Sequence, residues 1–421
     1  MIERLKIDLV ESGRFGRNPL CTVERYDQLD PKKGVTRPTG TAADKAVRDY
    51  AVARMKEAGL SVRIDRLGNI FARRAGVKTN TGTVMCGSHL DSVIDGGQFD
   101  GALGVFGAIE AIRRLNDEGY QNARPIEVVV FTGEEGSAFG MTLLGSSALV
   151  GKIGVDEALS LENEQGKALE ESLKEIDYLG DSIEDLRGVD YFIELHVEQG
   201  PVLYDEGIPV GIVENISGIS WINAIIRGQA NHAGTTPMPM RRDALVAASE
   251  IVRFVNSRAS EMAARPGAST VGTVGKFNVF PNGTNIIPGR VEMGIDIRDV
   301  VQHDMDLVRN EVIEAIRSIP PKYNIEVEVS TPISHSPTPL SRKVVASIKD
   351  AAGELGIPAR IMNSGAGHDA QNMAAKVNTG MIFVPSVNGV SHSPMEWTEW
   401  DDIERSVRVL TQTLKNLSQQ G

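Results

Sequence analysis

TVMCGSHLDSVIDGGQFDG, residues 83–101, is the clearest indication of the fold, because a short apolar strand over 83–88 runs straight into a polar, glycine-rich loop. A helical pattern follows over 103–118, and a second apolar strand over 126–131 ends in TGEEG. Strand, loop and helix alternating at this spacing predict an α/β domain with a mixed, largely parallel sheet. Ligands of such sheets bind beyond the carboxyl ends of the strands. The polar residues that follow each strand are therefore the first candidates for a functional site.

The α/β pattern extends to both sides of this stretch, with a long interruption in the middle of the chain. Alternating apolar segments indicate strands, and apolar residues at helical spacing indicate helices. The further elements predicted in this way are a helix over 41–58, a strand over 61–71, a helix near 143–150, a strand over 191–197, a helix over 341–355, a strand over 380–384 and a helix over 399–417.

The interruption has a pattern of its own. From about Val213 onward, strands and helices follow one another in the order β-α-β-β-α-β, over 222–227, 243–257, 270–279, 290–298, 304–318 and 324–329. This order predicts a ferredoxin-like α+β domain inserted into the larger one. The predicted organisation is a first catalytic part at 1–212, an inserted domain at 213–331 and a second catalytic part at 332–421.

Composition and charge exclude several classes of protein. The 421 residues are 41% hydrophobic and 24% charged, as in ordinary globular proteins. The net charge of -12 disfavours nucleic acid and anionic membranes as partners, although residues 156–190, which we interpret as solvated helices, carry much of it. No apolar run approaches the roughly 20 residues that cross a bilayer. Two cysteines, Cys21 and Cys86, and a start without a signal-peptide core lead us to expect a cytoplasmic protein.

Three histidines follow predicted strands, namely His89, His196 and His392. Asp91 lies two residues after His89, so in an extended chain both side chains point the same way and the carboxylate can orient the ring. Asp100 follows in a loop whose glycines allow close approach. Imidazole and carboxylate groups in this number supply enough ligands for two divalent metal ions. For the stretch with His89, Asp91 and Asp100 taken alone, the simpler alternative is a hydrogen-bonded histidine at a strand end beside an aspartate in a turn.

Glu134 and Glu135 come directly after a buried strand, where charge is costly unless it has a purpose. Two metal ions about 3.5–4 Å apart share one carboxylate, which Asp100 suits, and leave a second carboxylate to move a proton. Either Glu134 or Glu135 suits that second task, and spacing alone does not decide between them. Zinc is the first candidate metal, and manganese, cobalt and nickel accept the same ligands. The chain has no GxSxG, GxxxxGK[ST] or HExxH motif that would favour another chemistry.

Six motifs in order resemble the hydantoinase/carbamoylase amidohydrolases, a branch of the dinuclear-metal aminoacylase/carboxypeptidase superfamily. They read GSHLDSVIDGGQFDG, FTGEEG, ELHVEQGPVL, RGQANHAGTTPM, GAGHDA and GVSHSP, and they span about residues 87–394. The resemblance implies that His89, Asp100 and His196 bind one metal ion. It also implies that Asp100, Glu135 and His392 bind a second one. Glu134 then matches the family's general base, and Asp91 matches the residue that supports His89.

The resemblance further implies that the inserted domain is a lid that also forms a homodimer. His232 matches the family histidine that stabilises the oxyanion, often from the neighbouring subunit. Asn285 and Arg298 match residues that hold the substrate carboxylate, and the alternatives are a loop histidine at 232 and a surface arginine at 298. Further substrate contacts match Gln199 and the backbone at Gly365 and Ala366, whereas His368 has a supporting role or caps the following helix.

The implied reaction is hydrolysis of N-carbamoyl-L-amino acids to the amino acid, carbon dioxide and ammonia. Allantoate, ureidoglycolate and 3-ureidopropionate are alternative small ureido substrates. A metallo-exopeptidase or aminoacylase is a weaker alternative, because peptidase relatives tend to carry an acidic ligand where this chain has His196. A non-catalytic binding protein on the same scaffold would lack one or more ligands, and this sequence has all of them.

Overall fold

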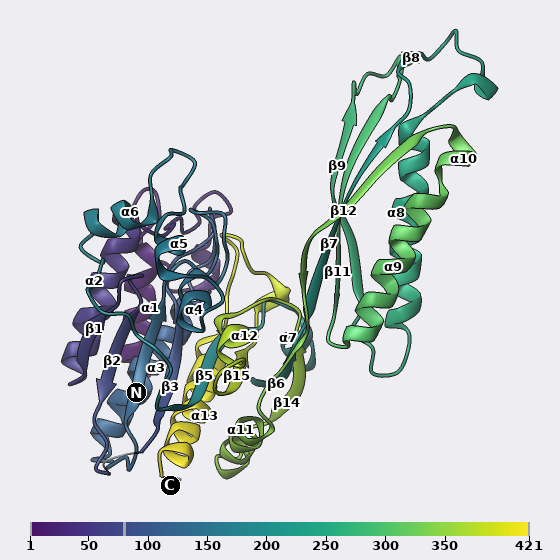
Figure 1. Ribbon diagram of the computed structural model, residues 1–421. Helices are drawn as coiled ribbons and strands as arrows, with labels where there is room; N and C mark the ends of the chain where they lie inside the picture. Colours follow the sequence, from purple (N-terminus) through teal and green to yellow (C-terminus); the bar gives the residue numbers. More distant parts are fainter. Residues whose placement is uncertain (1, 79–80, 420–421) are drawn as a thin grey trace. The chain divides into compact units, whose positions relative to one another are not determined.

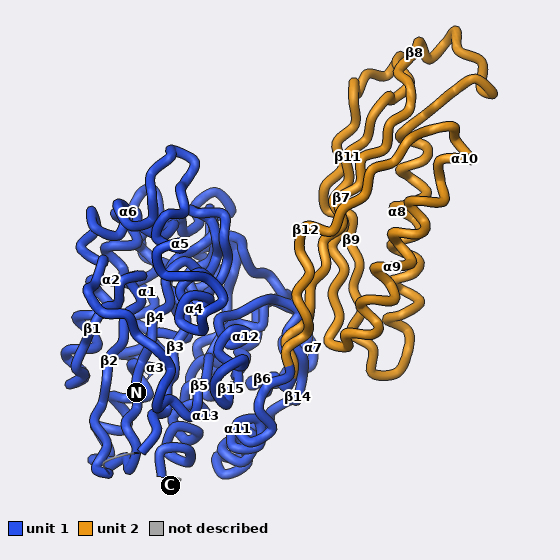
Figure 2. Tube along the Cα trace, in the orientation of Figure 1, with its two compact units in different colours: residues 1–214, 339–421 blue, residues 215–338 orange. Residues whose placement is uncertain are grey.

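The computed structural model describes residues 2–78 and 81–419 and divides into two compact units (Figures 1 and 2). Unit 1 comprises residues 1–214 and 339–421, and unit 2 comprises residues 215–338. In the described part of the chain, no helix has the length and apolar character needed to cross a membrane.

Unit 1 is built on a nine-stranded mixed sheet in the order β1-β2-β4-β3-β5-β15-β6-β13, with β14 paired to β6. The four central strands, β4, β3, β5 and β15, are parallel, as the sequence predicts for this domain. The strands are β1 (Ser61–Ile64), β2 (Ile70–Arg74), β3 (Thr83–His89), β4 (Ile126–Phe131), β5 (Val189–Val197), β6 (Val210–Ile216), β13 (Thr338–Pro339), β14 (Ala359–Ser364) and β15 (Asn378–Val384).

Helices cover the sheet of unit 1: α3, α11 and α13 contact its central strands, and α1 packs on α3 and α13. Alternate residues of a strand face different layers. On β5, Leu195 faces Gly107 of α3, whereas the next residue, His196, faces His368 just before α12. The helices are α1 (Ile2–Arg14), α2 (Ala42–Glu57), α3 (Ala102–Asp117), α4 (Leu144–Leu149), α5 (Val155–Leu159), α6 (Leu169–Glu175), α7 (Val202–Glu206), α11 (Arg342–Glu354), α12 (Asp369–Met373) and α13 (Trp400–Gln419), with short 3₁₀ turns η1 (Tyr26–Gln28) and η3 (Val387–Gly389).

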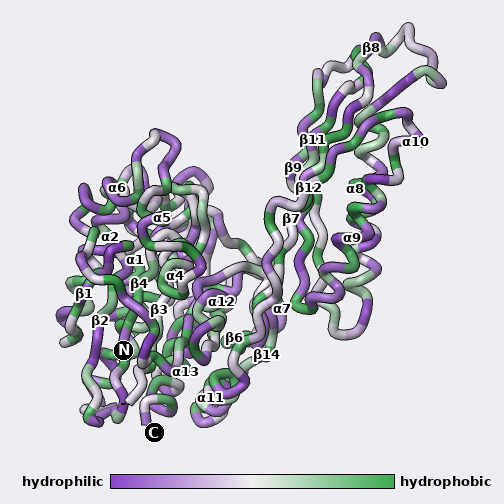
Figure 3. Tube along the Cα trace, in the orientation of Figure 1, coloured by the Kyte–Doolittle hydropathy of each residue, from purple (hydrophilic) through white to green (hydrophobic). Residues whose placement is uncertain are grey.

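Burial explains why the central strands are continuous apolar runs. Every residue of β3 and β4 is buried, because helices lie on both faces of these strands. Figure 3 shows the hydrophobic residues gathered along this part of unit 1. At the carboxyl ends of these strands the apolar residues stop and polar residues begin, so the candidate functional residues lie at the edge of the core.

Two predictions for unit 1 were wrong in detail. The strand expected over 61–71 is an antiparallel hairpin of β1 and β2, because Gly68 takes a φ of +77° and the Asp65 carboxylate accepts the N–H groups of Leu67 and Asn69. The acidic stretch 156–190 forms only two short helices, α5 and α6, before β5 begins. Its leucines at 159, 169 and 173 are buried in the core rather than solvated, so the segment covers part of unit 1.

Unit 2 is a four-stranded antiparallel sheet in the order β12-β7-β11-β9, with α8 and α9 packed on it. Ile222 on β7 and Ile295 on β11 alternate with exposed or half-buried neighbours and face the two helices. The elements are β7 (Gly218–Arg227), β8 (Asn231–His232), η2 (Met238–Met240), α8 (Ala244–Ala263), β9 (Val271–Phe280), β10 (Ile286–Ile287), β11 (Arg290–Asp299), α9 (Gln302–Ser318), α10 (Pro320–Tyr323) and β12 (Glu326–His335).

Candidate active site

Two buried histidines emerge from the ends of neighbouring parallel strands of unit 1. β3 ends at His89, and β5 carries His196 one residue before its end. The ring Nδ1 of His89 lies 3.1 Å from the carbonyl oxygen of Asp91, and that of His196 lies 2.9 Å from the carbonyl oxygen of Val197. A carbonyl only accepts, so each Nδ1 carries the proton and each Nε2 is left as a ligand atom.

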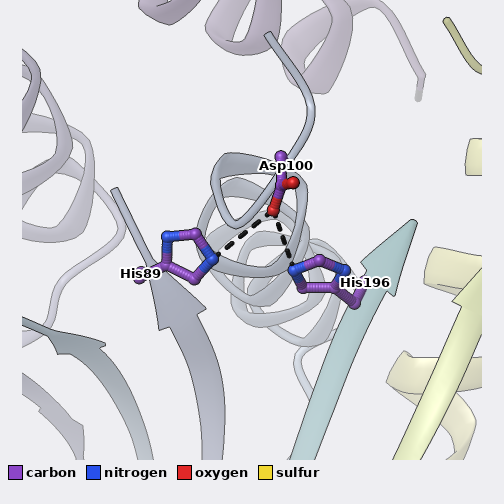
Figure 4. A group of neighbouring side chains, drawn as sticks. All are labelled: His89, Asp100 and His196. Carbon is purple, nitrogen blue, oxygen red and sulfur yellow. Dashed lines mark ion pairs between the residues drawn. The ribbon is translucent and has the colours of Figure 1, made fainter. Parts of the chain in front are cut away.

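Asp100 joins these histidines to a third one. Its Oδ1 lies 3.1 Å from Nε2 of His196 and 3.5 Å from Nε2 of His89 (Figure 4). Its Oδ2 lies 3.2 Å from Nε2 of His392. Gly101, with a φ of +64°, follows directly, and a Cβ there would lie 2.4 Å from the His89 ring, so only glycine fits. The glycine-rich loop therefore lets one carboxylate face three imidazoles.

Two overlapping clusters share Asp100, and both have the composition of a metal site. We call His89, Asp100 and His196 the inner group, and Asp100, Glu135 and His392 the outer group. In each group, one ligand atom per residue lies within 4.8 Å of the others. Glu135 Oε2 lies 3.4 Å from Nε2 of His392, and its Oε1 is buried with no hydrogen-bond partner among the described residues. Converging nitrogen and oxygen donors with an unsatisfied buried oxygen fit a divalent cation.

Glu134 and Glu135 diverge although they are adjacent. Both backbone N–H groups donate to the Asp91 carboxylate at 3.2 Å, which fixes the turn after β4. Glu134 Oε2 then lies 3.7 Å from Nε2 of His89, on the side of the inner group, while Glu135 reaches His392. The Asp91 carboxylate is 3.7 Å from the His89 ring, so Asp91 contacts that ring more closely through its backbone carbonyl.

Burial and mutual charge set the protonation of these groups. Burial, and then the negative charge of Asp100, raises the pKa of Glu135 to about 7. Burial also raises the pKa of Glu134 well above its ordinary value, against the opposing effect of His89. The hydrogen bond to Asp100 raises the pKa of His392 to about 9, although burial opposes it. With these raised pKa values, Glu134, Glu135 and His392 keep protons that reduce the net negative charge of the buried site.

Gln199 lies in the same site. Its side-chain Nε2 donates to Oδ2 of Asp100 at 2.8 Å and is 3.2 Å from Nε2 of His392. Its backbone N–H donates to the Ser386 hydroxyl at 3.0 Å, and its φ of +60° lies in the left-handed region. The loop after β5 therefore turns back towards the outer group.

Gly365 and Ala366 lie in the loop between β14 and α12. The Ala366 N–H donates to the Ser364 hydroxyl at 3.1 Å, and that hydroxyl lies 2.9 Å from Nε2 of His368. His368 precedes α12 without capping it through its side chain, and its ring stands edge-on to His196 with centroids 4.5 Å apart. This loop is thus linked to the inner group through His368.

The remaining predicted residues belong to unit 2, where His232 and Asn285 lie close together. β8 pairs with β10 so that Ile286 is opposite His232, and the Ala233 N–H donates to the Asn285 carbonyl at 2.9 Å. Nδ1 of His232 accepts the N–H groups of Gly234 and Thr235 at 3.0 and 3.2 Å. Its proton is therefore on Nε2, which makes the exposed edge of the ring a donor.

Arg298 lies elsewhere in unit 2. β8 and β10 adjoin the Arg290 end of β11, and Arg298 is eight residues along that strand, a distance of about 26 Å at 3.3 Å per residue. Its guanidinium donates from Nε and Nη2 to the Asp296 carboxylate at 2.9 and 3.0 Å. Unit 2 therefore does not bring Arg298 together with His232 and Asn285.

Comparison with known proteins identifies the group to which this arrangement belongs. The model of peptidase family M20/M25/M40 matches residues 85–416. The chain belongs to this family.

Several named relatives are similar to this chain over almost its whole length. It is 38% identical to an N-carbamoyl-L-amino acid amidohydrolase of Geobacillus stearothermophilus, over 99% of this chain and 98% of that one. A ureidoglycolate hydrolase of Arabidopsis thaliana is 36% identical over 97% of this chain and 90% of its own. A hydantoinase/carbamoylase-family amidase from Burkholderia multivorans has a solved structure that superposes with a TM-score of 0.93 at 36% identity, covering 100% and 98% of the two chains.

Membership of the M20/M25/M40 family makes the chain a hydrolytic enzyme of the amidohydrolase type. Enzymes of this family depend on metal ions, and the inner and outer groups are clusters that could hold them.

Sequence reasoning missed two buried glutamates beside the site. Glu194 on β5 accepts the Ser88 hydroxyl at 2.7 Å and the Ala370 N–H at 2.8 Å. Glu396, after His392, accepts the backbone N–H groups of Phe99 and Asp100. Each has a signal in the sequence, because Glu194 interrupts an apolar strand two residues before His196, and Glu396 directly precedes Trp397 in SPMEW.

Proposed function

We propose that this amidohydrolase cleaves the C–N bond between the carbamoyl group and the amino nitrogen of N-carbamoyl-L-amino acids. The products are the free amino acid, carbon dioxide and ammonia. The observation that carries the proposal is the Asp100 carboxylate, whose two oxygens face the inner and the outer group while Glu134 stands beside them. Full-length similarity to a relative named for this activity supports the substrate class.

In this proposal the inner group holds one divalent ion and the outer group a second, with Asp100 shared. The ligand set suits zinc, and manganese, cobalt or nickel accept the same nitrogen and oxygen donors. The chemistry that such a pair supplies is to lower the pKa of a water molecule and to polarise a carbonyl.

Glu134 is the proton carrier of the proposed reaction. It takes a proton from the attacking water and delivers it to the amino nitrogen of the substrate, so that a neutral amine leaves as the C–N bond breaks. Burial raises the pKa of Glu134, which lets the side chain hold the proton between these two steps. Asp91 keeps the side chain in place through the backbone N–H of Glu134. The carbamic acid that remains decomposes to carbon dioxide and ammonia.

His232 and Arg298 act on opposite ends of the substrate. The Nε2–H of His232 donates to the carbonyl oxygen as negative charge develops there. Arg298 of one subunit and Asn285 of the other, which lies beside His232, hold the amino-acid carboxylate. Gln199 and the backbone at Gly365 and Ala366 complete the proposed contacts. The long separation of His232 from Arg298 within unit 2 supports a homodimer, because a small substrate cannot reach both in one copy.

Mixing two inactive variants tests the homodimer. Glu134→Gln and His232→Ala subunits, unfolded apart and refolded together, should regain activity, because one site of the mixed dimer has both functional residues. Activity that stays at the level of the separately refolded variants would contradict the exchange of His232 between subunits.

Ureidoglycolate is the second candidate substrate, and the Arabidopsis relative favours it. Allantoate and 3-ureidopropionate present the same ureido group. Peptides and N-acyl amino acids are weaker candidates, since the inner group has His196 rather than an acidic residue.

A parallel assay tests the proposal. The protein is loaded in turn with zinc, manganese, cobalt and nickel, and kcat/KM is measured on N-carbamoyl-L-amino acids, allantoate, ureidoglycolate, 3-ureidopropionate and a dipeptide. We expect the highest kcat/KM on an N-carbamoyl-L-amino acid, with ammonia and the amino acid released in equal amounts. A higher kcat/KM on the dipeptide would overturn the proposal.

A further inference from the structure

Glu396 is a buried carboxylate to which the proposed reaction gives no task. It lies in the loop between His392 and α13 and is 1% exposed. Its Oε1 accepts the backbone N–H groups of Phe99 and Asp100, both at 3.0 Å, and its Oε2 accepts the Ser391 hydroxyl at 2.7 Å. One carboxylate therefore binds the peptide of Asp100 and the residue that precedes His392.

These contacts connect two distant parts of the chain. Glu396 is 296 residues from Asp100 in sequence, and unit 2 lies between them in the chain. Asp100 and His392 face each other across 3.2 Å in the outer group. The backbone of His392 has a φ of +50°, so its loop is held in a conformation that a free loop rarely adopts.

The packing around Glu396 leaves no spare room. A Cβ on Gly97 would lie 2.1 Å from Glu396 Oε1, so the loop before Asp100 passes directly against the carboxylate. A Cβ on Gly101 would meet His89 on the other side of Asp100. The loop GGQFDG is thus held between Glu396 and the inner group, with Gly97 and Gly101 as the points of closest approach.

We propose that Glu396 is a positioning residue that sets the separation of Asp100 and His392 and so determines how tightly the outer group binds its metal ion. This inference rests on the proposed metal centre. Glu396 acts through its hydrogen bonds to the loop rather than by contact with substrate or metal. The residue should therefore affect metal affinity more at the outer group than at the inner one, since Asp100 and His392 both depend on it, whereas His89 and His196 are oriented by their own strands.

Three variants test this role in the full-length protein, with metal affinity as the readout. Glu396→Ala removes all three hydrogen bonds, and Glu396→Gln keeps an oxygen that can accept the two N–H groups of the loop. Gly97→Ala disturbs the same contact from the other side. Glu399→Gln, three residues further on and exposed, is the matched control. Binding of zinc is measured by competition with a chromophoric chelator, and the unfolding midpoint of each metal-free variant is recorded.

We expect Glu396→Ala and Gly97→Ala to bind the weaker of two zinc ions about 10–100-fold less tightly, the usual effect of losing a residue that orients a ligand. Glu396→Gln should lie near the wild type, and Glu399→Gln should equal it. Cobalt(II) bound to Glu396→Ala should show an altered absorption spectrum, while the unfolding midpoint of Glu396→Gln stays unchanged.

Two results would overturn the inference. One is wild-type affinity for both zinc ions in Glu396→Ala and Gly97→Ala. The other is a loss in Glu396→Gln as large as in Glu396→Ala, which would indicate an effect of charge rather than position. A wild-type protein that binds no zinc is a different outcome, because it would contradict the proposed metal centre itself.

Discussion

The inner and outer groups share Asp100 but are built in different ways. His89 and His196 stand at the ends of two paired strands, are 1% exposed, and have both rings fixed by backbone carbonyls. His392 lies in a loop after η3, and its side chain is 51% exposed. Glu135, its neighbour, has an oxygen without a partner. The sheet itself fixes the inner group, whereas the outer group depends on loops that other side chains must hold.

Two ligand sets of similar composition can therefore differ in how tightly they bind a metal ion. Preorganised ligands lose little freedom on binding, so the inner group should bind its ion more tightly and exchange it more slowly.

The largest effect is expected at Glu134, which belongs to neither group. Glu134→Gln should keep both metal ions and lose about 10²–10⁴-fold in kcat, because it removes the proton carrier alone. Glu135→Gln is the matched control, and it should lose metal from the outer group. Metal analysis beside steady-state kinetics checks both variants. A Glu134→Gln enzyme with near-normal kcat would contradict the assignment.

A direct comparison of ligands comes next. His89→Ala should weaken the tighter ion by about 100-fold or more, since removal of an orienting partner alone costs 10–100-fold. His392→Ala should weaken only the other ion. Equilibrium dialysis followed by metal analysis separates the two. Equal losses of both ions in each variant would abolish the distinction between the groups.

Arg298 tests whether substrate binding is separate from both groups. Arg298→Ala should raise KM for an N-carbamoyl amino acid about 10–100-fold, because a charge-assisted bond to the carboxylate contributes about 1.5–3 kcal/mol. Metal content and kcat should change little. Arg227→Ala, on the same sheet, serves as the control and should leave KM unchanged. An unchanged KM in Arg298→Ala would exclude its role.

The smallest effect is a proton linkage at the outer group. Asp100 raises the pKa of His392 to about 9, so this imidazole is protonated at neutral pH when no ion is bound. A metal ion must displace that proton, so between pH 7 and 9 the metal affinity should rise by up to about tenfold per pH unit and then level off. Below pH 7 the rise should be steeper, because Glu135 must lose a proton as well. Calorimetry in two buffers of different ionisation enthalpy counts the released protons. His392→Ala should release about one proton fewer.

Much of unit 1 could be predicted because parallel strands are apolar runs with polar ends. The sequence predicts β4 with its observed bounds, and β3 and β5 nearly so. His89 and His196 lie at the ends of such strands, and Asp100 and Glu134 lie in the loops that follow them, so the same pattern brings all four to one edge of the sheet. The order of the main elements of unit 2 could also be predicted, since residues of β7 and β11 alternate between buried and more exposed positions.

The rest depends on tertiary contacts that leave no local pattern. β6 and β14 were missed, and Gly68 converts one expected strand into a hairpin. The direction in which Glu134 and Glu135 diverge depends on Asp91, which lies more than 40 residues away. Likewise, the position of His392 depends on Glu396 and Ser391, whose contacts with Asp100 join residues 296 and 291 positions apart in the sequence.

The order of strands in the sheet also governs how this protein can be made. β15 lies between β5 and β6, although all of unit 2 is synthesised before it. Unit 2 is continuous in sequence, so it can fold on the growing chain while β5 still has an open edge, and open edges pair readily with other chains. Unit 1 closes only when β15 arrives. The outer group could therefore take up an ion only after synthesis has passed His392, which would make metal loading one of the last steps in the formation of the enzyme.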